Sequence, residues 1–139
     1  METIVVGVDG SAHGEAALGF AAEEAALRGA RLLIVCAWEI PMIVEPMGAY
    51  PGEAFEGLGE NAGNILRAAV ARVGELQPLV ACEGKAIEGQ PAAALLKEAQ
   101  DADMIVVGSR GRGGFANLLL GSVTQQVVHH APCPVVVVR

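Results

Sequence analysis

Short, almost uninterrupted apolar runs recur along the chain, and they restrict the fold more than any other feature of the sequence. They cover residues 3–8, 31–38, 104–107 and 134–138, with a weaker run over 79–82. A strand buried on one face alternates apolar and polar residues, whereas a strand covered on both faces reads as a continuous apolar run. The runs therefore predict five strands in a mostly parallel sheet with helices on both faces.

The segments between the runs repeat apolar residues at helical spacing. The first ends at Gly29, a residue type that commonly follows a helix. The second covers about 53–76, the third opens at Pro91, where proline suits a first turn, and the fourth follows Gly121. Strands and helices that alternate in this way predict a doubly wound, Rossmann-like α/β fold, because right-handed crossovers leave few other arrangements.

Length and charge narrow the class of protein. The 139 residues suit one domain, 1–139. Mean hydropathy is +0.44, but no apolar stretch reaches the roughly 20 residues of a membrane helix. Because the first residues also lack the pattern of a secretory leader, we expect a cytoplasmic location and no membrane partner. A net charge of −7 argues against a nucleic-acid partner, since phosphates attract basic surfaces.

The cysteines and histidines give no sign of a metal or catalytic centre. The cysteines are widely spaced within apolar runs, as small buried residues are: Cys36, Cys82 and Cys133. The histidines lack the spacing of paired metal ligands: His13, His129 and His130. We therefore expect structural roles for these residues, with no catalytic residue and no metal ligand among them.

A glycine-rich segment joins the run over 104–107 to the last predicted helix. It has the spacing G-x2-G-x9-G-S, with Gly108, Gly111, Gly121 and Ser122 at the named positions. Glycines allow backbone N–H groups to approach a phosphate, and a helix N-terminus adds partial positive charge. The segment is neither a Walker A loop nor the dinucleotide fingerprint. It predicts a phosphate site, in which the serine hydroxyl can donate to phosphate or help hold a metal ion.

Asp9 points to the same edge of the sheet, because it ends the run over 3–8. Sheets of this class bind ligands beyond the carboxyl ends of their strands, where the strand order reverses. If the first and fourth strands flank that reversal, Asp9 and Gly108 meet in one crevice. Arg110 and Arg112 bring positive charge to an otherwise acidic protein. Together these residues predict a nucleotide site.

The sequence resembles the universal stress proteins, specifically the branch that binds ATP through G-x2-G-x9-G-(S/T). The resemblance extends over nearly the whole chain and is strongest over residues 4–11, 89–91, 105–111 and 131–138. It implies a five-stranded parallel sheet of order 3-2-1-4-5 and a ligand of ATP, with Mg²⁺ as a potential companion ion. It also implies a homodimer in which the final strands, Val135 to Val138, lie side by side.

The resemblance also assigns roles to matching residues. Asp9 would lie by the adenine and ribose, and Ala37 against the base. The ribose end would be lined by Val107 and Gly108. The phosphates would be taken by Gly111, Gly121, Ser122 and Val123. The complete predicted site is Gly7, Val8, Asp9, Gly10, Ser11, Ala37, Val107, Gly108, Ser109, Arg110, Gly111, Arg112, Gly121, Ser122 and Val123.

Two positions depart from the commonest family pattern. Cys36 stands where the family usually has His, and Ala37 where it usually has the bulkier Val. The base is therefore expected to pack more loosely than in typical members.

Three functions fit these observations. The first is a nucleotide-dependent regulatory or protective protein in the stress response, because the phosphate loop is complete without an evident base, nucleophile or metal cluster. The second is a slow ATPase or autophosphorylating enzyme, with Mg²⁺ and Ser122 supporting phosphoryl transfer; it ranks lower because no water-positioning residue stands out. The third is an interaction module without nucleotide binding, against which the intact glycines argue. ATP, ADP, AMP and cyclic nucleotides remain open as ligands.

Overall fold

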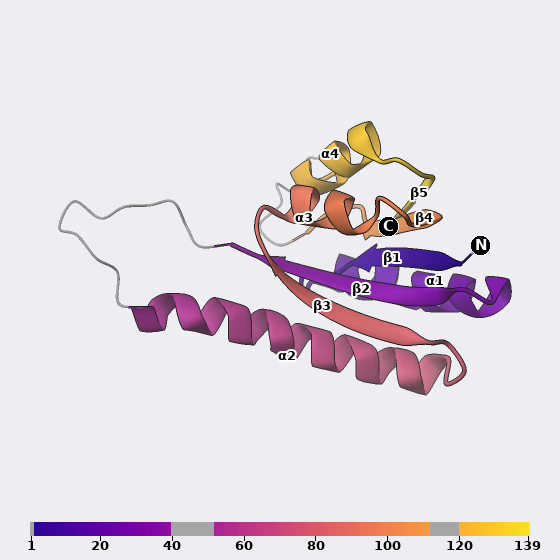
Figure 1. The fold of residues 1–139 in the computed structure, drawn as a ribbon, viewed down its shortest axis with the longest axis horizontal. Helices are drawn as coiled ribbons and strands as arrows, with labels where there is room; N and C mark the ends of the chain where they lie inside the picture. Colours follow the sequence, from indigo (N-terminus) through magenta and orange to yellow (C-terminus); the bar gives the residue numbers. More distant parts are fainter. Residues whose placement is uncertain (1, 40–51, 112–119) are drawn as a thin grey trace.

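The computed structural model describes residues 2–39, 52–111 and 120–139. The elements, in chain order, are β1 (Thr3–Gly7), α1 (Ala12–Arg28), β2 (Arg31–Trp38), α2 (Gly52–Leu76), β3 (Cys82–Glu88), α3 (Pro91–Glu98), β4 (Met104–Gly108), α4 (Ser122–His130) and β5 (Val135–Val138) (Figure 1). The prolines and glycines over residues 39–52 predict a loop, and nearly all of that segment lies outside the described residues. Arg112 of the predicted site also lies outside them.

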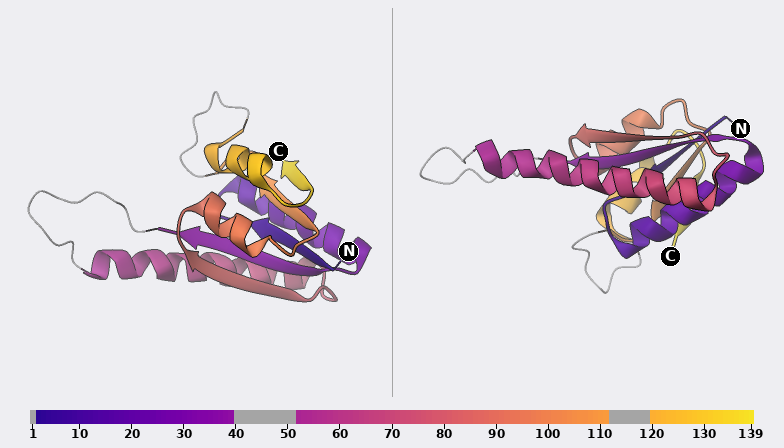
Figure 2. Two further views of the ribbon diagram at one scale, coloured as in Figure 1. Left: turned by 45° about the horizontal axis from the view of Figure 1, so that its top comes forward. Right: turned by 90° about the horizontal axis from the view of Figure 1, so that it is seen from below.

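The described strands form one five-stranded sheet in the order β3-β2-β1-β4-β5, with every neighbouring pair parallel. This confirms the predicted Rossmann-like α/β fold and its strand order. Helices α1 and α2 lie side by side on one face of the sheet, and α3 and α4 cover the other (Figures 1 and 2). Among the described residues, none of the helices combines the length and hydropathy needed to cross a bilayer.

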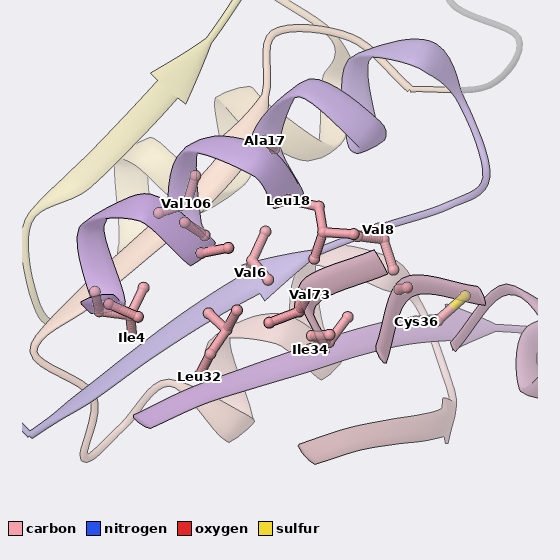
Figure 3. Packing of buried hydrophobic residues seen from close by; sticks show 14 of the residues in the cluster. Ile4, Val6, Val8, Ala17, Leu18, Leu32, Ile34, Cys36, Val73 and Val106 are labelled. Atoms are coloured by element: carbon pink, nitrogen blue, oxygen red, sulfur yellow. The ribbon is translucent and has the colours of Figure 1, made fainter. Parts of the chain in front are cut away.

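Alternate residues of the central strands supply two separate cores. Ile4 and Val6 of β1 pack toward α1 and α2, and Figure 3 shows this cluster. Val5, between them, packs toward α3 and α4. All three side chains have no exposed surface. Because both faces are covered, every position of the strand favours an apolar residue, which explains the continuous runs in the sequence.

Local signals define both ends of α1. Ser11 is the N-cap, and its side chain accepts the backbone N–H of Gly14. Gly29 follows the last turn with φ of +63°, the left-handed conformation that glycine adopts without strain. The end predicted from sequence at Gly29 is therefore confirmed.

The predicted position of the third strand was wrong. The sequence predicted it over 79–82, but Leu79 is fully exposed in a turn and the strand runs from Cys82 to Glu88. β3 is an edge strand, and most of its side chains are exposed. A strand of this kind needs no apolar run, so it carries polar residues such as Lys85, which forms an ion pair with Glu98 at 3.2 Å.

The cysteines were predicted to be small buried residues, and the structure buries each of them at least in part. All three lie in described segments and no disulfide joins them; Cys36 is buried, and Cys82 and Cys133 are half-buried. Burial raises the pKa of the Cys82 thiol. Burial also raises the pKa of the Cys133 thiol, with a smaller contribution from the negative charge of Asp103. Both thiols are therefore protonated at neutral pH and are poor nucleophiles.

Candidate functional site

A cavity of about 370 Å³ lies at the carboxyl edge of the sheet, within the range of about 300–1,000 Å³ typical of ligand pockets. It lies between β1 and β4, the neighbouring strands at which the chain switches from one side of the sheet to the other. This is the topological switch point where doubly wound sheets bind their ligands. The cavity is thus at the place that the sequence predicted.

Most residues of the predicted site line this cavity. They are Gly7, Val8, Asp9, Ala37, Val107, Gly108, Arg110, Gly111, Gly121, Ser122 and Val123. Gly10, Ser11 and Ser109 are described but are not among the lining residues. Ser109 is 3% exposed, and its hydroxyl lies 3.4 Å from Nδ1 of His13. Its side chain therefore lies beneath the cavity wall rather than in the wall.

The structure adds lining residues that the sequence reasoning missed: Gly14, Val35, Pro91, Leu95 and Thr124. Three of them carried a usable signal. Pro91 and Leu95 are four residues apart in the predicted third helix, so they share one face of it. Val35 precedes Ala37 by two residues in a strand and therefore points to the same side of the sheet. Nothing in the sequence marks Gly14 or Thr124 as lining residues.

The inner wall of the cavity is apolar. Val35 from β2, Leu95 from α3 and Val107 from β4 contribute to it, and each is at most 5% exposed. Gly7 keeps this wall flat, since a methyl group added there would lie 3.1 Å from Cδ2 of Leu95. An apolar wall of this kind suits a flat, uncharged ring system.

Asp9 is held in place by the start of α1. Its Oδ1 accepts the backbone N–H of Ser11 at 2.9 Å and also the Ser11 hydroxyl proton. Ser11 in turn accepts the N–H of Gly14 at 3.1 Å. Ser11 thus supports Asp9 from outside the cavity lining.

The other carboxylate oxygen of Asp9 faces the glycine-rich segment. A methyl group added at Gly111 would lie only 2.6 Å from Asp9 Oδ2. A side chain at position 111 would therefore have to displace the Asp9 carboxylate. The predicted meeting of Asp9 with the segment after β4 is therefore present in the structure.

The first turn of α4 borders the cavity. The helices α1 and α3 have side-chain caps from Ser11 and Gln90, whereas the N-cap of α4, Gly121, supplies none. Ser122 and Val123 of the first turn line the cavity. The first N–H groups and the partial positive charge of a helix start favour an anion at this end.

Metal ligation by the protein has no support in the part of the chain that is described. Those residues contain no group of three or more His, Cys, Asp or Glu side chains that could hold an ion. His129 and His130 lie in the last turn of α4. The cavity therefore combines an apolar wall, one carboxylate and a helix N-terminus, which together can bind a ligand with a ring at one end and an anion at the other.

Comparisons with known sequences point to one family. The family model described as Universal stress protein family matches residues 1–139. A universal stress protein of Thermus aquaticus is 40% identical over 145 residues, covering 99% of this chain and 98% of the relative. Relatives in Mycobacterium bovis and Mycobacterium tuberculosis are 38% identical over 136 residues, which cover 98% of this chain and 45% of theirs. The chain thus spans about half the length of these longer relatives.

Solved structures of the family share the fold, and some contain nucleotides. A universal stress protein in complex with cAMP is 31% identical with a TM-score of 0.76, over 99% of this chain and 97% of that one. The universal stress protein from Archaeoglobus fulgidus in complex with dAMP is 25% identical with a TM-score of 0.72, over 100% of this chain and 98% of that one.

Proposed function

The chain belongs to the universal stress protein family, and from this we propose that it binds ATP in the cavity and acts as a nucleotide-dependent regulatory or protective protein. One observation carries the proposal: a single cavity joins an apolar wall to the first turn of α4, whose N-cap residue Gly121 supplies no side-chain cap. That combination matches the two chemically different ends of a nucleotide. The complexes of relatives with cAMP and dAMP support an adenine nucleotide as the ligand class.

In the proposed orientation, the base rests on the apolar wall formed by Val35, Ala37 and Leu95. Asp9 accepts hydrogen bonds from the nucleoside. The phosphates lie at Gly111 and at the first turn of α4, where Arg110 and Ser122 also line the cavity. Mg²⁺ would enter as the counter-ion of the phosphates, because the described residues offer no cluster of ligands for it.

ATP is chosen over nucleotides with fewer phosphates because every named residue of the glycine motif borders the cavity. Gly108, Gly111, Gly121 and Ser122 all line the cavity, so the whole glycine motif is available to phosphate oxygens. The proposal includes a cytoplasmic location, where ATP is plentiful, and ligand binding rather than fast turnover as the basis of function.

The test is to identify the nucleotide that the protein carries. Purified protein is denatured, the released small molecules are identified by mass, and nucleotide-free protein is titrated with ATP, ADP, AMP and cAMP by calorimetry. We expect release of an adenine nucleotide and tightest binding of ATP. Tighter binding of AMP or cAMP would contradict the choice of ATP. The absence of both released nucleotide and heat of binding would contradict the function itself.

We further propose a homodimer that pairs through β5. This strand is last in the sheet order, so its outer edge borders no other described strand, and its four valines are all half-buried. Unpaired N–H and C=O groups along an apolar edge favour pairing with another chain. A two-fold pairing joins the edge to itself and leaves no end for further growth.

Replacing Val136 or Val138 with lysine is expected to shift this dimer to monomer, because like charges would meet across the two-fold axis. Sedimentation velocity at micromolar concentration measures the change. Leu79→Lys is the matched control, since Leu79 is fully exposed beside the opposite edge strand, β3. A monomeric parent protein, or a dimer that tolerates both lysines in β5, would contradict this interface.

A further inference from the structure

Two polar side chains are buried in the described part of the chain, and both lie next to the start of α4. They are Ser109 and Thr124, each 3% exposed. Buried polar groups are nearly always hydrogen-bonded, because an unpaired one costs free energy. The partner of Thr124 shows what this side chain does.

The Thr124 hydroxyl joins α4 to the end of β4. Its Oγ1 donates to the backbone oxygen of Gly108 at 2.7 Å, in a buried position. Next to it, the N–H of Gly121 donates to the backbone oxygen of Ser109 at 2.7 Å. Two successive carbonyl groups at the end of β4 therefore each accept one hydrogen bond from the start of α4.

The end of β4 is itself firmly held. The N–H of Ser109 donates to the backbone oxygen of Val138 at 2.8 Å, which ties it to the end of β5. On the side of α1, the Cα of Gly108 packs so closely against the His13 main chain that an added methyl group would lie 2.7 Å from the His13 oxygen. The carbonyl of Gly108 is therefore held in place, and a hydrogen bond to it can fix the orientation of α4.

Orientation matters because α4 has nine residues and its N-cap, Gly121, provides no side-chain cap. The field of a helix start falls off within one turn, and hydrogen bonds weaken steeply as their angle departs from linear. A small tilt of α4 would therefore turn its first N–H groups away from an anion in the cavity.

We propose that Thr124 is a positioning residue for the phosphate end of the site: through its hydrogen bond to Gly108 it aims the N-terminus of α4 at the phosphates of the ligand. The inference rests on the proposed function, because it concerns the same cavity. The hydroxyl proton of Thr124 is committed to Gly108, so this residue acts on the ligand through the helix.

The test compares ATP with adenosine, which lacks the phosphates that α4 would face. Thr124→Val removes the hydroxyl and keeps the shape of the side chain, and Thr124→Ser keeps the hydroxyl. We expect Thr124→Val to raise the dissociation constant of ATP about fivefold while that of adenosine changes less than about twofold. Thr124→Ser is expected to restore the parent ratio of the two constants.

Val127→Ala is the matched control for loss of stability. Val127 has no exposed surface, lies in the same helix and is not a lining residue of the cavity. A merely structural role for Thr124 would make Val127→Ala and Thr124→Val change the ratio alike, once both are shown to be folded by circular dichroism. If the valine variant does not fold, Thr124→Cys, whose thiol is a weak donor, is expected to shift the ratio in the same direction.

The outcomes separate the two proposals. If the parent protein does not bind ATP, the proposed function falls and this inference falls with it. If the parent binds ATP and neither Thr124→Val nor Thr124→Cys changes the ratio of ATP to adenosine affinity, the inference alone is overturned. The same holds if Val127→Ala changes the ratio as much as Thr124→Val does.

Discussion

Replacing Gly108 with alanine is expected to lower the melting temperature by roughly 10 °C, equivalent to a loss of about 3 kcal/mol in the free energy of unfolding. The added methyl group would lie 2.7 Å from the oxygen, 2.8 Å from the carbonyl carbon and 2.9 Å from the Cβ of His13. Two of these atoms belong to the backbone of α1, so a rotamer change cannot relieve the contact. The first turn of α1 would have to move away from the sheet.

A second glycine provides the control for this effect. Gly19 is also described, lies within α1, and an added methyl group would meet no atom within 4 Å. Gly19→Ala is expected to raise stability by about 0.5–1 kcal/mol, because alanine favours a helix. Thermal and urea unfolding followed by circular dichroism measures both variants. A Gly108→Ala protein that melts within about 2 °C of the parent would show that the close packing at His13 is not rigid.

Replacing Gly121 with valine is expected to weaken ATP binding at least about tenfold, or ~1.4 kcal/mol in binding free energy. The reason is space. Gly121 has φ of −69° and ψ of 164°, a conformation open to any residue. An added methyl group would lie 3.4 Å from the Cα of Arg110 and 3.6 Å from the backbone nitrogen of Gly111. One methyl group fits at ordinary contact, and the two further methyl groups of valine occupy the corner where the phosphates would lie.

Gly121→Ala separates space from other effects, because its single methyl group makes only ordinary contacts. We expect the alanine variant to retain most of the affinity for ATP and the valine variant to lose it, with both folded. Calorimetric titration beside a circular dichroism spectrum gives both readings. If a folded Gly121→Val variant bound ATP as tightly as the parent, the phosphates would have to lie elsewhere.

Packing around Gly108 and Gly121 also shows what sequence reasoning could and could not reach. The motif spacing predicted both positions, because glycines between a strand and a helix are typical of phosphate sites. It did not say why each must be glycine. At Gly108 the cause is the His13 backbone, almost a hundred residues away in the chain, and only the folded structure brings the two together.

The sequence by itself determined the features that depend on local chemistry. Continuous apolar runs predicted the central strands, since a strand covered on both faces has no polar side. Gly29 predicted the end of α1 and Pro91 the start of α3, because each residue type favours one backbone conformation. The same local signals placed Asp9 and the glycine motif at strand ends, and parallel strands bring such ends to one edge.

Only the tertiary structure decided the features that depend on contacts between distant segments. β3 covers Cys82–Glu88 rather than the predicted run over 79–82, because an edge strand, exposed along most of its length, needs no apolar pattern. The apolar wall of the cavity comes from β2, β4 and α3 together, and no single stretch of sequence contains it. The hydrogen bond from Thr124 to Gly108 joins residues sixteen positions apart. A buried hydroxyl finds its partner through packing, so its role becomes visible only when α4 lies against the end of β4.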